Sequence, residues 1–167
     1  DLHTGGHTAV HGLTKPMDTE IHALVKEAGF DMFVSTYDEQ VDGLFYDNIS
    51  NEAMNWYWHE RTRANDKRLR RVDDTAEVMA HQVININVLS LRAPLMELEA
   101  ALRVTFGPRI HTYFYENWAD PSWYWLSIFD YHATKGNAIQ RLLDTYGFSS
   151  ENLTVFGDSY NDLPMFE

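Results

Sequence analysis

Cysteine is absent from the 167 residues, and its absence removes several kinds of chemistry at once. Without thiols, the chain has no disulfide framework, no cysteine nucleophile and no cysteine-based zinc site. No apolar run approaches the ~20 residues that a transmembrane helix needs, and no signal-peptide pattern is visible. We therefore expect a cytoplasmic protein that does not bind membranes.

Positive charge is also scarce: 13 lysines and arginines stand against 25 aspartates and glutamates, a formal net charge of -12. Such a surface repels the phosphates of nucleic acids and of anionic lipids. The basic cluster at residues 61–71 is interpreted as a solvated helix end and turn, because clustered charges usually lie on the surface. We expect no nucleic-acid partner.

The pattern of apolar residues predicts an α+β fold for residues 16–130, after an irregular arm at residues 1–15. Alternating stretches predict strands, and apolar residues three and four apart predict helices. The expected helices are at 19–28 (capped by Asp18), after Ser50 or Asn51, after Asp74 or Thr75, and at 94–105, and the strands are at 32–36, 43–47, 83–90, 111–117 and 123–129. This order is typical of an antiparallel sheet with helices on one face.

Alternation within the predicted strand 83–90 assigns Val83, Asn85, Asn87 and Leu89 to one face and Ile84, Ile86 and Val88 to the other. Residues 131–167 differ from the rest. They contain a predicted helix from Lys135 to Tyr146 and a short buried strand at 153–158, the order of a doubly wound α/β fold.

Acidic residues follow this last predicted strand. Asp158 and Asp162 are four residues apart, and Asn161 precedes the second acid. Ligands of open α/β sheets bind beyond the carboxyl ends of the strands, and hard oxygen ligands there suit Mg²⁺. Lys135 opens the preceding helix, where a bound phosphate would interact favourably with both the ammonium group and the helix dipole.

Taken together, these two features resemble the C-terminal part of Cof-type (type IIB) phosphatases of the haloacid dehalogenase (HAD) superfamily. A Lys-Gly pair opens a helix, and a Gly-Asp-x-x-Asn-Asp loop follows, here Lys135-Gly136 and Gly157 to Asp162. The resemblance implies a type-II cap domain at 16–130 and a partial Rossmann-like core element at 131–167. It also implies metal-dependent hydrolysis of a phosphomonoester or phosphodiester in a small phosphorylated substrate.

The resemblance further implies roles for individual residues. Lys135, Asp158 and Asp162 would be catalytic, with Lys135 holding the phosphate. Asp158 and Asp162 would bind Mg²⁺, Asp162 directly or through water, and Asn161 would contact nearby oxygens. The cap selects the substrate in this family, so Asn117 and Trp118, in the loop between two predicted cap strands, are candidates for substrate binding.

The sequence departs from the family at the nucleophile. The Asp-x-Asp-Gly motif that ends the family's first strand is not found, and Asp1-Leu2-His3 is only a faint counterpart. Two alternatives to the ordinary mechanism stay open: a non-catalytic, truncated cap domain, and a hydrolase that uses metal-bound water. Mn²⁺ or Zn²⁺ could serve in place of Mg²⁺.

Three histidines near the N-terminus bear on the second alternative. His3, His7 and His11 are spaced by four, so they would share one face of a helix and could hold a transition metal. The neighbouring glycines Gly5, Gly6 and Gly12 disfavour a helix there.

Finally, a lone core strand would leave an open sheet edge, so we expect a homodimer or domain-swapped oligomer through residues 131–167.

Overall fold

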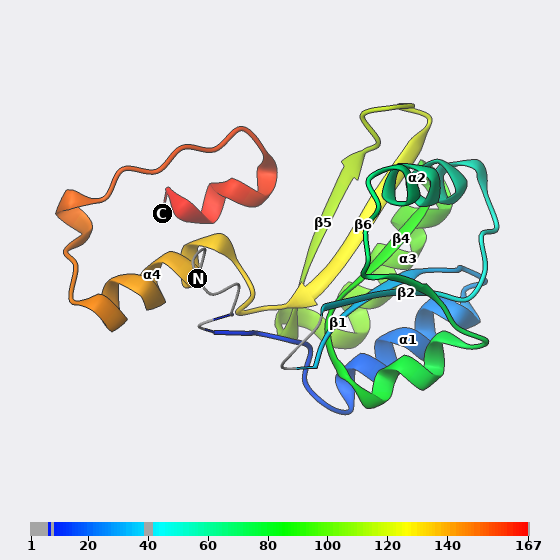
Figure 1. Cartoon of the computed structure of the whole chain (residues 1–167), viewed down its shortest axis with the longest axis horizontal. Helices are drawn as coiled ribbons and strands as arrows, with labels where there is room; N and C mark the ends of the chain where they lie inside the picture. The colour runs from blue at the N-terminus through cyan, green and yellow to red at the C-terminus, as the bar shows by residue number, and fades with distance from the viewer. Residues whose placement is uncertain (1–6, 8, 39–41, 167) are drawn as a thin grey trace. The chain divides into compact units, whose positions relative to one another are not determined.

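The computed structural model describes residue 7 and residues 9–38 and 42–166. The chain forms two compact units, Asp1–Asp130 and Tyr131–Glu167 (Figure 1). Among the described residues, no helix combines the length and the apolar character that crossing a membrane requires.

The first unit is built on a six-stranded sheet with the strand order β3-β2-β1-β4-β6-β5. Strands β2 and β3 pair in parallel, and the other pairs are antiparallel. The strands are β1 (Phe33–Tyr37), β2 (Asp42–Tyr46), β3 (Leu69–Arg71), β4 (Gln82–Leu91), β5 (Ile110–Glu116) and β6 (Trp123–Asp130). The helices are α1 (Met17–Glu27), α2 (Glu52–Arg63) and α3 (Arg92–Phe106), with short 3₁₀ turns η1 (Thr75–Ala80) and η2 (Gly107–Arg109).

Apolar side chains on both faces of the sheet are buried, so both faces need a cover. Helices α1 and α3 pack on one face, where Ile21 and Leu102 join Ile86 in the larger core cluster. Helix α2 packs on the other face, where Met54 joins Phe33. The α+β architecture is confirmed. The prediction of helices on one face holds for α1 and α3 and is wrong for α2.

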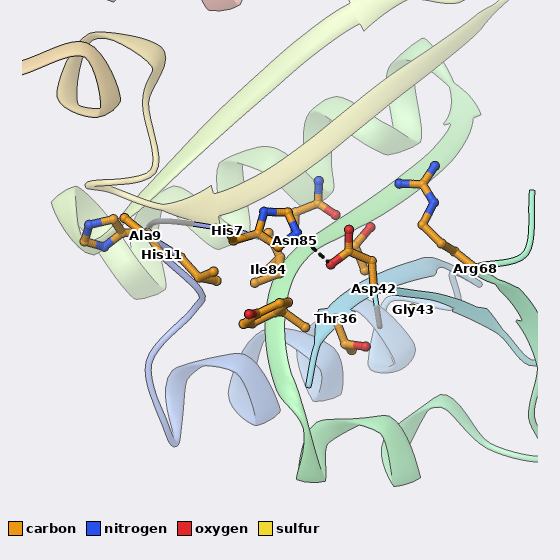
Figure 2. A pocket seen from close by; sticks show the side chains of 12 residues that line it. His7, Ala9, His11, Thr36, Asp42, Gly43, Arg68, Ile84 and Asn85 are labelled. Carbon is orange, nitrogen blue, oxygen red and sulfur yellow. Dashed lines mark ion pairs between the residues drawn. The ribbon is translucent and has the colours of Figure 1, made fainter. Parts of the chain in front are cut away.

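A β-bulge in β4 changes the predicted alternation of that strand. Ser35 of β1 lies opposite Asn85, and the next residue, Thr36, lies opposite Val83, so Ile84 is the extra residue. Val83 therefore joins Ile86 in the core cluster under α1 and α3 instead of sharing a face with Asn85. The bulge leaves Asn85 facing the side of the sheet that carries a pocket of about 330 Å³ (Figure 2).

Two further predictions for the first unit need correction. Asp18 does not cap α1: the helix begins at Met17 after Pro16, and the fully buried Asp18 side chain forms an ion pair with Lys15. Part of the basic stretch is not a helix end or turn but strand β3, which extends the sheet beside β2. A three-residue strand is too short to be detected from its own sequence pattern.

The second unit consists of α4 (Lys135–Tyr146) and the 3₁₀ turns η3 (Ser150–Asn152) and η4 (Tyr160–Met165). Helix α4 begins and ends where the sequence predicts, with Gly147 at a φ of 69° after its last residue. The predicted buried strand at 153–158 is wrong: these residues form no strand, and Phe156 is 88% exposed. The described residues of this unit contain no strand. Residues 153–158 therefore have no neighbouring strand with which their backbone N–H and C=O groups could pair.

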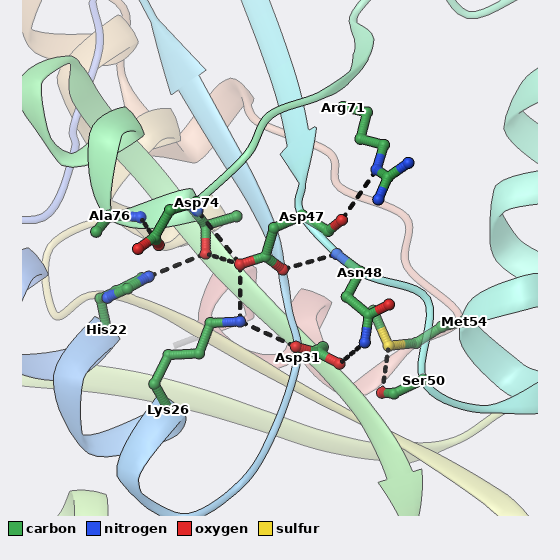
Figure 3. A network of polar contacts seen from close by, with 11 residues as sticks. His22, Lys26, Asp31, Asp47, Asn48, Ser50, Met54, Arg71, Asp74 and Ala76 are labelled. Atoms are coloured by element: carbon green, nitrogen blue, oxygen red, sulfur yellow. Dashed lines mark hydrogen bonds and ion pairs between the residues drawn. The ribbon is translucent and has the colours of Figure 1, made fainter.

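A polar network ties α1 and η1 to the end of β2 (Figure 3). The Lys26 ammonium lies 2.9 Å from Asp31 Oδ1 and 2.8 Å from Asp47 Oδ2. The Thr75 hydroxyl donates to Asp47 Oδ2 at 3.0 Å, and His22 Nε2 lies 3.0 Å from the same hydroxyl. Because the hydroxyl has one proton and the carboxylate can only accept, His22 must donate through Nε2. Burial, and then the charge of Lys26, lowers the pKa of His22 and favours the neutral ring.

The same network makes the stability of the first unit depend on pH. Burial raises the pKa of Asp47, but hydrogen bonds from Lys26 and Thr75 outweigh this effect, so its pKa lies below the ordinary 3.8. The pKa of Asp31 is lowered in the same balance. Their stabilising contribution is therefore complete above pH 4 or so and is lost as the pH falls through the lowered values.

We predict that Lys26→Met lowers the free energy of unfolding of the first unit by about 2 kcal/mol, because it leaves two partly buried carboxylates without their cation. All five tryptophans lie in this unit, so urea unfolding followed by tryptophan fluorescence reports on it alone. Lys67→Met, at an exposed site, is the matched control and should cost under about 0.5 kcal/mol. Equal losses for the two variants would contradict the role given to Lys26.

Candidate active site

The structure brings Lys135 and Asp162 together at the first turn of α4. The Lys135 ammonium forms an ion pair with Asp162 Oδ1. Asp162 Oδ2 accepts hydrogen bonds from the backbone N–H groups of Asp158 and Ser159, each at 3.1 Å. Asp162 is 4% exposed. Both of its carboxylate oxygens therefore have hydrogen-bonding partners, although the side chain is almost fully buried in the loop that begins at Gly157.

These contacts keep the Asp162 side chain ionised. The hydrogen bond from Lys135 lowers the pKa of Asp162 most, burial opposes it, and the two backbone N–H groups lower it further. The net effect is a pKa below the ordinary value. An ionised Asp162 holds the ammonium of Lys135 at a helix N-terminus, where the helix dipole alone would disfavour a cation.

Two glycines allow this close packing. A Cβ on Gly157 would lie 2.4 Å from Asp162 Cβ, and a Cβ on Gly136 would lie 2.0 Å from the Pro164 carbonyl oxygen. Sequence reasoning missed the backbone of Ser159 as part of the site. The Ser-x-x-Asp spacing of Ser159 and Asp162 is a capping-box pattern and could have indicated it.

Asp158 and Asn161 are the residues of this loop that fit a metal ion. The Asp158 side chain is exposed, and Asn161 Oδ1 is buried without a hydrogen-bond partner. A carboxylate and an amide oxygen are hard ligands that suit Mg²⁺, which keeps several waters and takes few protein ligands. Asp162 has already committed both oxygens, so its role as a direct ligand stays a prediction. Among the described residues, no three His, Cys, Asp or Glu side chains form a group that could hold a metal.

The N-terminal histidines are not brought together as a helical face. His3 lies outside the described residues, and the described residues before Lys15 form no helix. His7 Nε2 instead lies 3.3 Å from Asp42 Oδ1, and its ring meets Tyr37 edge-on. Metal binding by His3, His7 and His11 stays a prediction.

Asn117 and Trp118 lie in the turn between β5 and β6. Asn117 is 2% exposed, and its Oδ1 accepts a hydrogen bond from the backbone N–H of Ala119 at 3.2 Å, so it shapes the turn. Trp118 is 82% exposed, and its ring meets that of Trp56 edge-on with centroids 5.4 Å apart. Their contact with a substrate stays a prediction.

We predict that Gly157→Ala disrupts the loop, because the added methyl group and the Asp162 side chain cannot occupy the same space. The amide signals of Asp158 and Ser159 in ¹H–¹⁵N NMR spectra should move toward unfolded-chain values as their bonds to Asp162 are lost. Gly147→Ala is the control for a general loss of stability: nothing lies within 4 Å of its added Cβ, but its φ of 69° strains an alanine, and it should leave the amide signals of Asp158 and Ser159 in place. Unmoved amide signals in Gly157→Ala would contradict the packing described here.

Comparison with solved structures gives relatives that share this fold. A haloacid dehalogenase-like hydrolase from Bacteroides thetaiotaomicron is 19% identical with a TM-score of 0.69, and the match covers 93% of this chain and 53% of that one. A haloacid dehalogenase-like hydrolase from B. subtilis is 15% identical with a TM-score of 0.66, covering 93% and 58%. BT1666 from Bacteroides thetaiotaomicron, described among phosphatases of the HAD enzyme superfamily, is 14% identical with a TM-score of 0.62, covering 93% and 51%.

At these identities the likeness shows the fold alone, and the chain spans about half the length of the structures it matches. A comparison with curated proteins finds no match. The sequence profile of one family, described as haloacid dehalogenase-like hydrolase, matches residues 3–167. The chain therefore belongs to the haloacid dehalogenase-like hydrolases.

Proposed function

We propose that this chain takes part in the hydrolysis of phosphate esters, monoesters or diesters, of small phosphorylated substrates. The observation that carries the proposal is the Lys135–Asp162 ion pair at the first turn of α4, beside the exposed carboxylate of Asp158. A cation and a helix N-terminus at the same point attract a phosphoryl group. Phosphoryl transfer depends mainly on positioning and on charge stabilisation, which such a clamp supplies.

Each residue has a distinct role in the proposal. Lys135 neutralises charge on the phosphoryl oxygens, and Asp162 acts as a positioning residue that orients the Lys135 ammonium. Asp158 and Asn161 would hold Mg²⁺, or Mn²⁺ or Zn²⁺ in its place, through one carboxylate and one amide oxygen. Such an ion, when bound, neutralises phosphoryl charge and orients the substrate. Asn117 and Trp118 are proposed to contact the substrate.

The proposed hydrolysis needs a group that attacks phosphorus. The sequence has no Asp-x-Asp-Gly motif, so the family's nucleophile is not among these 167 residues in its usual form. We propose water as the attacking group in the hydrolytic candidate. A non-catalytic domain that binds phosphate and metal is the second candidate, and the missing motif is the observation that favours it.

We predict release of p-nitrophenol from p-nitrophenyl phosphate or its bis-ester in the presence of Mg²⁺, Mn²⁺ or Zn²⁺. EDTA should abolish the reaction, and Asp158→Asn should reduce its rate at least about a hundredfold, since one ligand and its charge are lost. Asp144→Asn removes an exposed carboxylate from α4 and is the matched control.

The outcomes separate the candidates. Metal-dependent turnover that Asp158→Asn removes and Asp144→Asn keeps would support hydrolysis by this chain. Metal-dependent binding of inorganic phosphate without turnover would support the non-catalytic candidate. If a folded sample shows no turnover and does not bind phosphate, the proposed function is contradicted.

We also propose that the second unit pairs with a second copy of the chain, as a dimer or a domain-swapped oligomer. Phe148 is 66% exposed and Phe156 is 88% exposed, an unusual loss of apolar burial for a unit of this size. Light scattering should give a mass above the monomer's 19.4 kDa, and Phe148→Glu with Phe156→Glu should lower it. Val104→Glu, at an 87% exposed site on α3, is the control. A monodisperse monomer for the unmodified chain would contradict this proposal.

A further inference from the structure

The two edges of the sheet in the first unit differ in how well they resist pairing with a further strand. One edge is β3, which is three residues long and ends in two arginines. The other edge is β5, the outermost strand in Figure 1, which is seven residues long and pairs with β6 without a bulge. Its sequence contains no proline, lysine or arginine, and Glu116 at its end is its one acidic residue. Short or charged edge strands resist pairing, whereas long uncharged ones recruit another strand, so β5 is the unprotected edge.

Alternate residues of β5 direct their backbone groups away from the sheet. The Asn117 N–H donates to the Trp123 carbonyl oxygen at 2.8 Å, and this pair continues the β5–β6 register. In an antiparallel ladder, such hydrogen-bonded pairs alternate with pairs whose N–H and C=O groups point to the other side. The outward-pointing backbone groups of β5 therefore belong to Ile110, Thr112, Phe114 and Glu116. A strand placed beside β5 could form hydrogen bonds with all of these groups.

The two ends of β5 carry opposite charges. Just before the strand, Arg109 donates to the backbone carbonyl oxygens of Phe106 and Thr105, which are uncharged partners. At its end, the Glu116 carboxylate accepts a hydrogen bond from the uncharged Tyr124 hydroxyl at 2.8 Å. An antiparallel copy of the same strand brings unlike ends together, whereas a parallel copy brings like charges together. This charge pattern fits a second copy of the chain in the antiparallel orientation.

We propose that β5 pairs with β5 of a second copy about a two-fold axis and so joins two six-stranded sheets into one. Pairing of the whole strand fixes the register, because Ile110 then lies opposite Glu116 of the other copy and Tyr113 lies opposite its own counterpart. Arg109 is next to Ile110, so it adjoins Glu116 of the other copy, and the two-fold axis forms this contact twice. The proposal is independent of the proposed hydrolysis and uses a different surface from the pairing proposed for the second unit.

Aromatic side chains would meet across the axis on one face of the joined sheet. Tyr113 is in ring contact with His111 at a centroid distance of 4.5 Å. Tyr115 stacks on Trp125 with centroids 6.2 Å apart. In the proposed register Tyr113 faces Tyr113, and His111 faces Tyr115 of the other copy, and such cross-strand aromatic pairs stabilise antiparallel strands. Because Tyr113 directs its backbone groups toward β6, its pair is of the closer type, with Cα atoms about 4.5 Å apart.

The absence of cysteine allows a direct test, because a single introduced thiol has no partner within its own chain. All variants carry Phe148→Glu and Phe156→Glu, so that pairing through the second unit does not contribute. Tyr113→Cys should form a disulfide between copies under mild oxidation, since its Cα separation of about 4.5 Å lies in the range that disulfides span. Val104→Cys, at an 87% exposed site on α3, is the control and should cross-link at least about tenfold more slowly, because its thiols meet only by diffusion.

A second measurement does not depend on oxidation. Sedimentation of the Phe148→Glu, Phe156→Glu protein should still show a dimer, at twice the monomer's 19.4 kDa. Adding Tyr113→Lys places two ammonium groups opposite each other across the axis. It should raise the dissociation constant of the dimer about fivefold or more relative to Tyr113→Gln, which loses the same ring without adding a charge.

Faster cross-linking of Tyr113→Cys than of Val104→Cys, together with a weaker dimer in Tyr113→Lys than in Tyr113→Gln, would support the pairing. Equal cross-linking rates for the two cysteine variants would overturn it. A protein that sediments as a monomer at every concentration once Phe148 and Phe156 are replaced would overturn it as well, even if the Tyr113 variants fail to fold. Equal dissociation constants for Tyr113→Lys and Tyr113→Gln would contradict the pairing about Tyr113.

Discussion

The Asp162 carboxylate holds together Lys135 and the loop to which we assign metal and phosphate binding. One oxygen pairs with the Lys135 ammonium and the other accepts two backbone N–H groups, from Asp158 and Ser159. Burial of this one charge requires these partners to lie close to it. This requirement explains the geometry of the loop, the position of the Lys135 ammonium at α4 and the need for a glycine at position 157. Leaving the buried carboxylate without these partners would cost free energy. The loop and the first turn of α4 are therefore held together and have little freedom to rearrange.

The two units differ in how completely they bury their apolar residues. The first has a core on each face of its sheet, with Ile86 and Phe33 fully buried on opposite sides. In the second, Leu143 is the buried large apolar side chain among the described residues, while Phe148 and Phe156 are exposed. The first unit therefore has a core of its own, whereas the exposed apolar side chains of the second form the surface that we propose pairs with a second copy.

Local signals in the sequence predicted the elements whose stability is local. The ends of α4 are set by Thr134, whose side chain caps the helix, and by Gly147, and the β1–β2 hairpin follows from two adjacent apolar stretches. Features that depend on distant partners were not predicted: the β4 bulge exists because Thr36 pairs with Val83, and β3 exists because β2 lies beside it. The strand expected at 153–158 is wrong for the same reason, because the described residues of the second unit contain no strand that could pair with it. Within the site, the motif indicated Lys135 and Asp162. That both Asp162 oxygens have hydrogen-bonding partners depends on the folded loop and could not be predicted from the sequence.

We propose that the loop from Gly157 to Asp162 is the metal- and phosphate-binding part of the molecule. The most direct measurement is paramagnetic broadening of amide signals by substoichiometric Mn²⁺ in ¹H–¹⁵N NMR spectra, with phosphate present. We predict selective loss of the signals of Asp158, Asn161 and Lys135, with no such loss in Asp158→Asn. Broadening centred instead on the acidic residues around Asp47 and Asp74, or on His7 and Asp42, or no selective broadening at all, would contradict the account.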